Sequence, residues 1–276
     1  MAKLKVSSSV KQFQLKAQKA WGLTDWGGVD DPDPVLVFFG LFHDRDFEVF
    51  HNFKGTKHVF WCGGDILRLL QDYERRRVIK ISKDTFHYCE NETEAQSLRQ
   101  AGIEPQIIPS FLGDINDYSD SFKVPTDGKW KIWMNAHPHR ELEYGLDYAR
   151  QIAKMFPDVE FHVYGVDKEY EGKIVNEADD LIVFHGLVPE AQLDADIKNY
   201  QCGFRANEHD GLSEVIVKSI LLGQYVISRL EYEGAYFFSK LEDIIYAIQL
   251  LKLQTEPNKA RELWINKLNN FPFLQR

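Results

Sequence analysis

The sequence has 276 residues, a length that allows one large domain or two of modest size. Hydrophobic residues make up 44% of it and charged residues 27%, which is typical of a soluble globular protein and argues against a disordered or collagen-like chain. The formal net charge of −9 leaves no general basic surface for a nucleic-acid backbone, so we expect no nucleic-acid partner.

Membrane segments and disulfides are not expected either. The longest apolar stretches fall far short of the ~20 residues that span a bilayer, so no transmembrane segment is predicted. The first residues lack the apolar core of a secretory signal, which favours a cytoplasmic location. Cys62, Cys89 and Cys202 are odd in number and far apart, so we expect reduced thiols.

Strand and helix patterns alternate along the first half of the chain. The continuous apolar run at 35–42 is typical of a strand buried on both faces of a parallel sheet, and a polar, turn-rich stretch at 27–34 precedes it. Ser7 to Ser9 offer an N-cap for the first helix. We predict strands at 4–6, 35–42, 58–62, 78–82 and 106–109, and helices at 10–21, 66–75 and 92–101.

The alternation breaks at 123–128, where Pro and Gly interrupt a polar segment, and we place a linker there. The pattern then restarts, with the last helix expected to return toward the first domain. We predict strands at 131–134, 160–164, 181–184, 202–205 and 225–228, and helices at 141–155, 190–199, 213–222, 240–252 and 258–268. The expected fold is therefore α/β, with two Rossmann-like domains (1–124, shortened, and 125–276) facing across a cleft.

Polar loops follow four predicted strands of the second domain. They cover 135–140, 165–168, 185–189 and 205–213. In open parallel sheets, ligands bind beyond the carboxyl ends of the strands, where helix N-termini carry partial positive charge. We therefore expect the ligand site at this edge.

Several blocks of this half occur in an order typical of one family. They are 145–149, 156–165, 184–188, 210–213 and 222–227, and together they resemble the nucleotide-binding half of retaining glycosyltransferases of the two-Rossmann (GT-B) fold, close to family 4. The resemblance covers about residues 131–228; in the first half it is weaker and rests on 61–65, 90–103 and 107–109. It implies a hexosyltransferase-type enzyme that moves a sugar from a nucleoside-diphosphate sugar to a hydroxyl acceptor on a glycan or small molecule. It implies no metal and no cofactor besides the donor.

The resemblance also assigns residues to the donor. Arg140 would bind the diphosphate, although it could equally be a solvated Arg paired with Glu141 or Glu143. Backbone groups at Gly186, Leu187 and Val188 would hold the base. The remaining donor-binding candidates are Asn135, His137, Gly165, Arg205, Asn207, Gly211, Leu212, Ser213 and Glu214, with Ser213 also able to cap its helix.

One position departs from the family pattern. The family has two Glu residues separated by seven, the first at the donor sugar and the second at the ribose, and here Asp210 and Lys218 stand at these places. An ammonium cannot accept hydrogen bonds from ribose hydroxyls. Lys218 could act on the diphosphate, or pair with Glu214 four residues earlier on the helix, and Glu214 could itself take over the ribose.

In the first domain the resemblance implies an acceptor side. Its candidates are Gly40, Gly63, Gly64 and Asp65, with His43 as a catalytic candidate, although Asp65 could simply cap the following helix. A non-catalytic GT-B-like subunit that binds a glycan, nucleotide or partner enzyme is the alternative function. A nicotinamide-dependent dehydrogenase is disfavoured because no G-x-G-x-x-G follows a strand.

Overall fold

The computed structural model describes residues 2–28, 34–82, 84–169 and 177–274. The chain divides into two compact units. Unit 1 comprises Met1–Asp114, His209–Leu212 and Asn266–Arg276, and unit 2 comprises Ile115–Glu208 and Ser213–Ile265. The predicted linker at 123–128 lies within unit 2, and most of the predicted turn at 27–34 lies outside the described residues.

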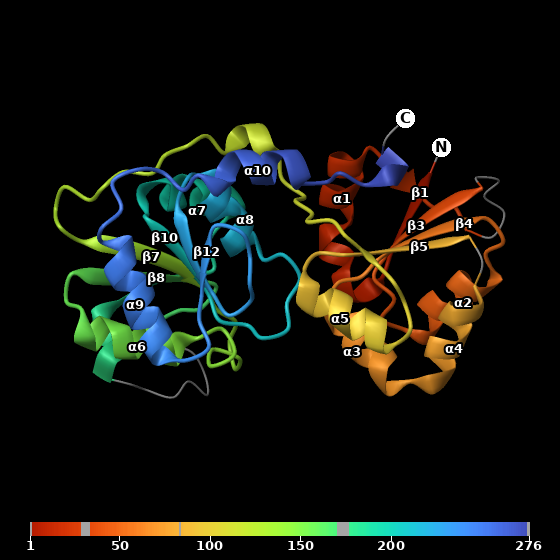
Figure 1. Cartoon of the computed structure of the whole chain (residues 1–276), viewed down its shortest axis with the longest axis horizontal. Helices are drawn as coiled ribbons and strands as arrows, with labels where there is room; N and C mark the ends of the chain where they lie inside the picture. Colours follow the sequence, from red (N-terminus) through yellow and green to blue (C-terminus); the bar gives the residue numbers. More distant parts are fainter. Residues whose placement is uncertain (1, 29–33, 83, 170–176, 275–276) are drawn as a thin grey trace. The chain divides into compact units, whose positions relative to one another are not determined.

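Unit 1 is built on a six-stranded parallel sheet in the order β2-β1-β3-β4-β5-β6. The strands β1, β3, β4 and β5 are labelled in Figure 1. Its strands are β1 (Lys3–Val6), β2 (Thr24–Asp25), β3 (Val35–Phe39), β4 (Thr56–Phe60), β5 (Thr85–Cys89) and β6 (Gln106–Ile107). Its α-helices are α1 (Gln14–Trp21), α2 (Asp44–Asn52), α3 (Gly64–Gln71), α4 (Tyr73–Ile81) and α5 (Glu92–Gln100).

Both faces of this sheet are buried, which explains the unbroken apolar run of β3. Because side chains alternate across a strand, Leu36 and Phe38 pack on one face with α2 to α5, while Val37 and Phe39 pack on the other. On that second face they meet Trp21 of α1 and the C-terminal segment of the chain.

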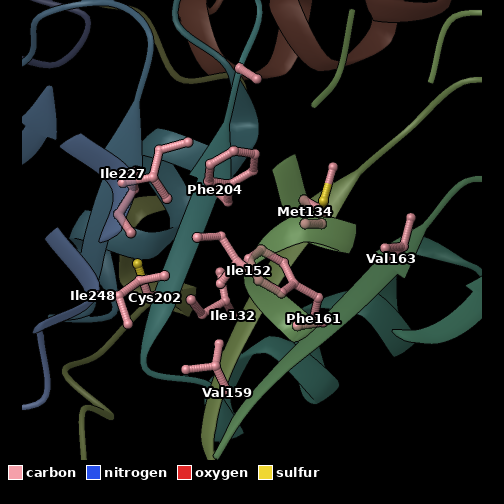
Figure 2. Packing of buried hydrophobic residues seen from close by; sticks show 14 of the residues in the cluster. Ile132, Met134, Ile152, Val159, Phe161, Val163, Cys202, Phe204, Ile227 and Ile248 are labelled. Carbon is pink, nitrogen blue, oxygen red and sulfur yellow. The ribbon is translucent and has the colours of Figure 1, made fainter. Parts of the chain in front are cut away.

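Unit 2 has a second six-stranded parallel sheet, in the order β12-β11-β10-β7-β8-β9. Its strands are β7 (Trp130–Asn135), β8 (Val159–Tyr164), β9 (Ile182–Gly186), β10 (Cys202–Arg205), β11 (Tyr225–Ser228) and β12 (Ala235–Phe237). Its helices are α6 (Leu146–Met155), α7 (Glu190–Asp196), α8 (Glu214–Leu221), α9 (Leu241–Leu251) and most of α10 (Ala260–Lys267). Figure 2 shows apolar side chains from β7, β8, β10 and β11 packing with Ile152 of α6 and Ile248 of α9.

The predicted α/β fold with two parallel sheets is confirmed, and the strands at 202–205 and 225–228 have the predicted bounds. The predicted strand at 78–82 is wrong, because Val78, Ile79 and Ile81 belong to α4, which buries Ile79. The edge strands β2 and β12 and the strand β5 were not predicted. Ser7 stands at the N-cap position of the 3-10 helix Ser8–Phe13, but its side chain makes no capping hydrogen bond; its hydroxyl instead donates to Asp46 of α2 at 2.6 Å.

Within the described residues, no helix is both long and apolar enough to cross a membrane.

Candidate functional site

Three adjacent strands of unit 2 each deliver an arginine at or after their carboxyl ends. Arg205 ends β10, Arg229 directly follows β11, and Arg140 lies in the loop after β7. Because the sheet is parallel, these strands end at one edge, and the N–H of Arg229 donates to the carbonyl of Arg205 at 2.9 Å. A chain of net charge −9 therefore carries three guanidinium groups along one sheet edge.

Arg205 is the most constrained of the three. It is only 8% exposed, its Nη1 donates to Asn135 Oδ1 at 2.7 Å, and its guanidinium lies 4.7 Å from the ring centroid of Tyr144. The guanidinium of Arg140 lies 5.9 Å from the same ring. Tyr144 thus brings two cations together, a role that the sequence analysis did not assign to it.

Arg140 and Arg229 are also paired with surface carboxylates. Arg140 is exposed and donates twice to Glu143, at 2.6 and 2.9 Å, which confirms the pairing that the sequence analysis left open. Arg229 donates to Glu208 at 2.8 Å. Such exposed pairs are weak, so an anionic ligand can compete for both guanidinium groups.

Asn207 follows Arg205 by two residues and is 9% exposed. Its Oδ1 is buried and is among the described side-chain oxygens that lack a hydrogen-bond partner. A buried carbonyl oxygen without a donor is costly. The atom is suited to accept a hydrogen bond from a ligand hydroxyl or N–H group.

The neighbouring loops bring backbone rather than charge to this edge. Gly165, after β8, has φ +90°, and a Cβ there would lie 2.4 Å from the carbonyl oxygen of Ala136, so only glycine fits. Its N–H donates to the carbonyl of Gly186 at 2.8 Å.

Leu187 is 90% exposed, and His137 is exposed with its Nδ1 2.8 Å from the carbonyl oxygen of Pro138. Val188 lies half-buried in the same loop as Leu187.

Lys218 is wholly buried in a cluster of charges. Its Nζ lies 2.8 Å from Asp194, 3.2 Å from Glu214 and 3.4 Å from Glu190. Burial alone would lower the pKa of Lys218, but these carboxylates outweigh burial and hold it above its usual range. The pairing with Glu214, one of the two alternatives that the sequence left open, is present, whereas the two partners on α7 were not predicted. Ser213 caps α8 as predicted, its Oγ accepting from the N–H of Val215 at 3.2 Å.

The segment His209–Leu212 belongs to unit 1, where it contacts two residues after β5. Glu90 Oε2 accepts from the N–H of Leu212 at 2.6 Å, and Asn91 Nδ2 donates to the carbonyl of Asp210 at 2.8 Å. Burial raises the pKa of Glu90 to about 7, against the lowering effect of hydrogen bonds from Ser110 and Leu212. Asp210, Gly211 and Leu212 therefore belong to unit 1, whereas the other donor-binding candidates belong to unit 2.

The first-domain candidates lie at the carboxyl ends of β3 and β4. Asp65 is fully buried and accepts from the N–H groups of Leu41 and Cys62 at 2.9 Å and of Ile66 at 3.0 Å, which ties the two strand exits together. Burial raises its pKa to about 6. His43 is the N-cap residue of α2, and its Nε2 lies 2.9 Å from Ser9 Oγ. Gly40 follows β3, Gly63 is the N-cap residue of α3, and Gly64 begins that helix.

The fold of this chain is similar to those of several solved protein structures. No family model matches the chain, and no curated protein matches it. Among solved structures it is similar to the lipopolysaccharide outer core galactosyltransferase WaaB, with a TM-score of 0.64 and 10% identity over 97% of this chain and 80% of WaaB. It is similar to TarM, with a TM-score of 0.58 and 14% identity over 84% of this chain and 51% of TarM. The chain thus spans about half the length of TarM.

A third similar structure is the glycosylation-associated Gap123 complex from Streptococcus agalactiae, with a TM-score of 0.50 and 14% identity over 84% of this chain and 51% of that one. At these identities the similarity shows the fold alone. The chain has the GT-B fold, with two parallel Rossmann-like sheets.

Proposed function

We propose that this chain is a GT-B glycosyltransferase whose unit 2 binds the diphosphate of a nucleoside-diphosphate sugar. The observation that carries the proposal is the arrangement of Arg205, Tyr144 and Arg140 at the carboxyl edge of the sheet, with Arg205 held by Asn135. A diphosphate needs local cations in an acidic protein, and guanidinium groups bind its oxygens bidentately. WaaB, a galactosyltransferase, shares the fold.

The chemistry follows from this binding. The bond between the anomeric carbon and the diphosphate breaks, a bond to the acceptor hydroxyl forms, and the hydroxyl proton is released. Arg140 and Arg205 stabilise the negative charge that develops on the leaving diphosphate. Asn207 Oδ1 accepts from a donor hydroxyl, and the backbone at 186–188 holds the base. The family resemblance implies that the anomeric configuration is retained, with Asp210 at the donor sugar and His43 on the acceptor side.

We infer that Lys218 does not contact the diphosphate. Its ammonium already meets three carboxylates, so it positions Glu214 and its neighbours rather than touching the donor. Glu214, with 41% of its side chain exposed, then takes the place of the second family glutamate at the ribose.

Titration calorimetry with UDP-, GDP-, ADP- and dTDP-glucose tests donor binding. Arg205→Ala should weaken the affinity for the preferred donor about 10- to 100-fold, because a hydrogen bond to a charged group contributes about 1.5–3 kcal/mol. Arg140→Ala should have a smaller effect because that side chain is half exposed. Affinity for the free nucleoside should be unchanged in both variants.

The matched control is Arg77→Ala, which removes an exposed arginine of α4 paired with Glu74 in unit 1. It should bind the donor as the wild type does. Transfer is then followed by NMR of the product, which also reports the anomeric configuration, with and without EDTA. Wild-type protein that binds none of the four donors would contradict the proposal.

A non-catalytic binding subunit is the second candidate function. The buried Lys218 cluster favours it, since a lysine stands where the family has its second glutamate. The fold similarity to the Gap123 complex is compatible with this function as well. Binding of a nucleotide sugar without hydrolysis or transfer of its sugar would support this candidate over the enzyme.

A further inference from the structure

Unit 2 has a surface pocket at the opposite edge of its sheet from the proposed donor site. The pocket has a volume of about 440 Å³ and opens to solvent. Its walls come from the segment 121–131, which contains the predicted linker, and from the segment 198–201, both at the amino ends of β7 and β10. On β7, Lys131 stands four positions before Asn135 of the donor site, which is roughly 13 Å at about 3.3 Å per residue.

This pocket is basic although the chain has a formal net charge of −9. The charged groups of its described lining are Asp127 and four lysines, Lys123, Lys129, Lys131 and Lys198. Lys129 pairs with Glu160 at 3.4 Å, and Nζ of Lys131 lies 3.9 Å from Asp127. Lys123 and Lys198 are exposed, and neither has an ion-pair partner among the residues that the structure describes. The pocket therefore presents ammonium groups that are free to bind an anion.

A buried glutamine joins the two walls of the pocket. Gln201 is only 5% exposed, its Nε2 donates to the carbonyl of Lys123 at 3.2 Å, and its Oε1 accepts from the N–H of Lys131 at 2.9 Å. The N–H of Gln201 also donates to the carbonyl of Lys131 at 3.0 Å. These bonds fix the backbone that carries two of the four lysines, so a ligand has little backbone to order when it binds.

Ser121 adds a neutral hydrogen-bonding group to the same lining. Its Oγ is among the described buried side-chain atoms that have no hydrogen-bond partner. A serine hydroxyl both donates and accepts, and rotation about a single side-chain bond redirects it. It can therefore donate to an anionic oxygen in the pocket.

We propose that this pocket binds the phosphate group of a small, soluble phosphate ester such as a sugar phosphate. A phosphate monoester carries about 1.5 to 2 negative charges near pH 7 and has three strong acceptor oxygens. Lysine ammonium groups, which only donate hydrogen bonds, match these oxygens. The volume of the pocket lies within the ~300–1,000 Å³ of small-molecule sites, which leaves room for the organic part of the ester.

Amide NMR of the full chain tests the inference, with glucose 6-phosphate as the probe and glucose as its uncharged counterpart. The amide resonances of residues 121–131 and 198–201 should shift with the sugar phosphate and not with glucose. The affinity should fall when the sodium chloride concentration rises from about 0.1 to about 1 M, because the Debye length shortens from about 10 to about 3 Å.

A double variant removes the two lysines that have no ion-pair partner. Lys123→Gln with Lys198→Gln should weaken binding of the sugar phosphate at least tenfold, because hydrogen bonds to charged groups are lost and no carboxylate is left without its partner. The matched control is Lys154→Gln with Lys259→Gln, which removes two exposed lysines of unit 2 outside the pocket and changes the net charge equally. The control should bind the sugar phosphate as the wild type does.

The carboxylate in the lining gives a variant with the opposite effect. Asp127→Asn keeps an acceptor for the N–H of Lys129, which Asp127 Oδ1 accepts at 3.0 Å, and removes one negative charge. It should tighten binding of the sugar phosphate about two- to fivefold, because like charges at the pocket repel the ligand.

Four results would overturn the inference. They are the absence of shifts at these amides, an unchanged affinity in the Lys123 and Lys198 variant, equal weakening in that variant and in its control, and binding to lipid alone. The last is tested by sedimentation with phosphatidylglycerol vesicles: vesicle binding that only the pocket variant loses, without binding of the sugar phosphate, would assign the lysines to a lipid headgroup instead.

The site does not depend on the proposed function, and donor titrations separate the two. Arg205→Ala should leave the sugar-phosphate shifts at residues 121–131 unchanged, and the pocket variant should bind the nucleotide sugar with wild-type affinity, because the two sites lie at opposite edges of the sheet. A wild-type protein that binds the sugar phosphate at this pocket but no nucleotide sugar would contradict the proposed function alone. The reverse result would contradict the pocket alone.

Discussion

Lys218 is a single residue that changes the chemistry of helix α8. The family resemblance expects a carboxylate at this position, and the chain instead has a fully buried ammonium with three carboxylates within 3.4 Å. The three partners keep between 27% and 46% of their side chains exposed. The lysine is therefore an internal counter-ion that holds α7 and α8 together, and its partners remain open to a ligand.

Replacing this lysine tests that role. Lys218→Met should lower the free energy of unfolding by about 2–3 kcal/mol, less than the ~3–5 kcal/mol of a fully buried pair, because the remaining carboxylates can rehydrate. Urea denaturation followed by circular dichroism measures it. Lys168→Met is the control, since Lys168 pairs with Asp180 at an exposed site, and it should unfold as the wild type does. A wild-type stability for Lys218→Met would contradict the role.

At the scale of elements, the C-terminal segment is an integral part of unit 1. Phe271 is 0% exposed, and its ring centroid lies 5.4 Å from that of Trp21, 5.6 Å from Phe60 and 5.5 Å from Tyr88. Residues from α1, β4 and β5 thus share one aromatic cluster with the end of the chain.

Truncating this side chain should be costly. Phe271→Ala should destabilise the protein by about 3–5 kcal/mol, because a buried phenylalanine leaves a cavity. Phe237→Ala, which truncates a phenylalanine 48% exposed on β12, is the matched control and should have a much smaller effect. Thermal and urea unfolding measure both variants, and equal losses would show that the cluster does not anchor the segment.

Sequence patterns predicted most elements because burial on both faces of the sheets leaves clear apolar runs. They failed at 78–89, where Val78, Ile79 and Ile81 read as a strand but form a helix with one buried face. The true strand, β5, contains His87 between Phe86 and Tyr88 and lacks a continuous apolar run. Since β5 was missed, so was the carboxylate at its end, Glu90.

The candidate site could be predicted only in part, because local sequence patterns place a residue along its strand or helix but do not encode how two helices pack. Arg205 ends a clear strand and Asn207 follows it, so their place at the sheet edge could be inferred. The pairing of Lys218 with Glu214 follows from helical spacing. Its pairing with Asp194 depends on how α7 packs against α8, which no local pattern encodes.

At the scale of the whole molecule, the two units differ in the buried groups whose pKa values are shifted: unit 1 has both carboxyl groups and histidines of this kind, and unit 2 has a histidine. In unit 1, burial raises the pKa of Asp65 to about 6 and that of Glu90 to about 7, and it lowers the pKa of His58 and His87 to about 4. In unit 2, burial lowers the pKa of His162 to about 4. Among the described residues, the carboxyl groups with raised pKa values lie in unit 1.

The units should therefore respond differently to pH. A carboxyl with a raised pKa binds its proton more readily when folded, so stability rises as pH falls through the folded value, about 7 for Glu90, by at most about 1.4 kcal/mol per pH unit. A histidine with a lowered pKa acts in the opposite sense below its unfolded pKa of about 6.5.

Lowering the pH from about 8 to about 6.5 should thus stabilise unit 1 and leave unit 2 nearly unchanged, since few histidines titrate in that range. A further decrease to about 4.5 should destabilise unit 2 through His162, while in unit 1 the carboxyl groups and His58 and His87 offset one another.

Hydrogen exchange with mass spectrometry, corrected for the intrinsic pH dependence of exchange, resolves the two sheets. Protection of β3 to β5 should increase in the first step and that of β7 to β10 should not. Glu90→Gln, which keeps an acceptor for the N–H of Leu212, should remove part of the gain; a gain of equal size in both sheets would mean that these carboxyl groups do not control it.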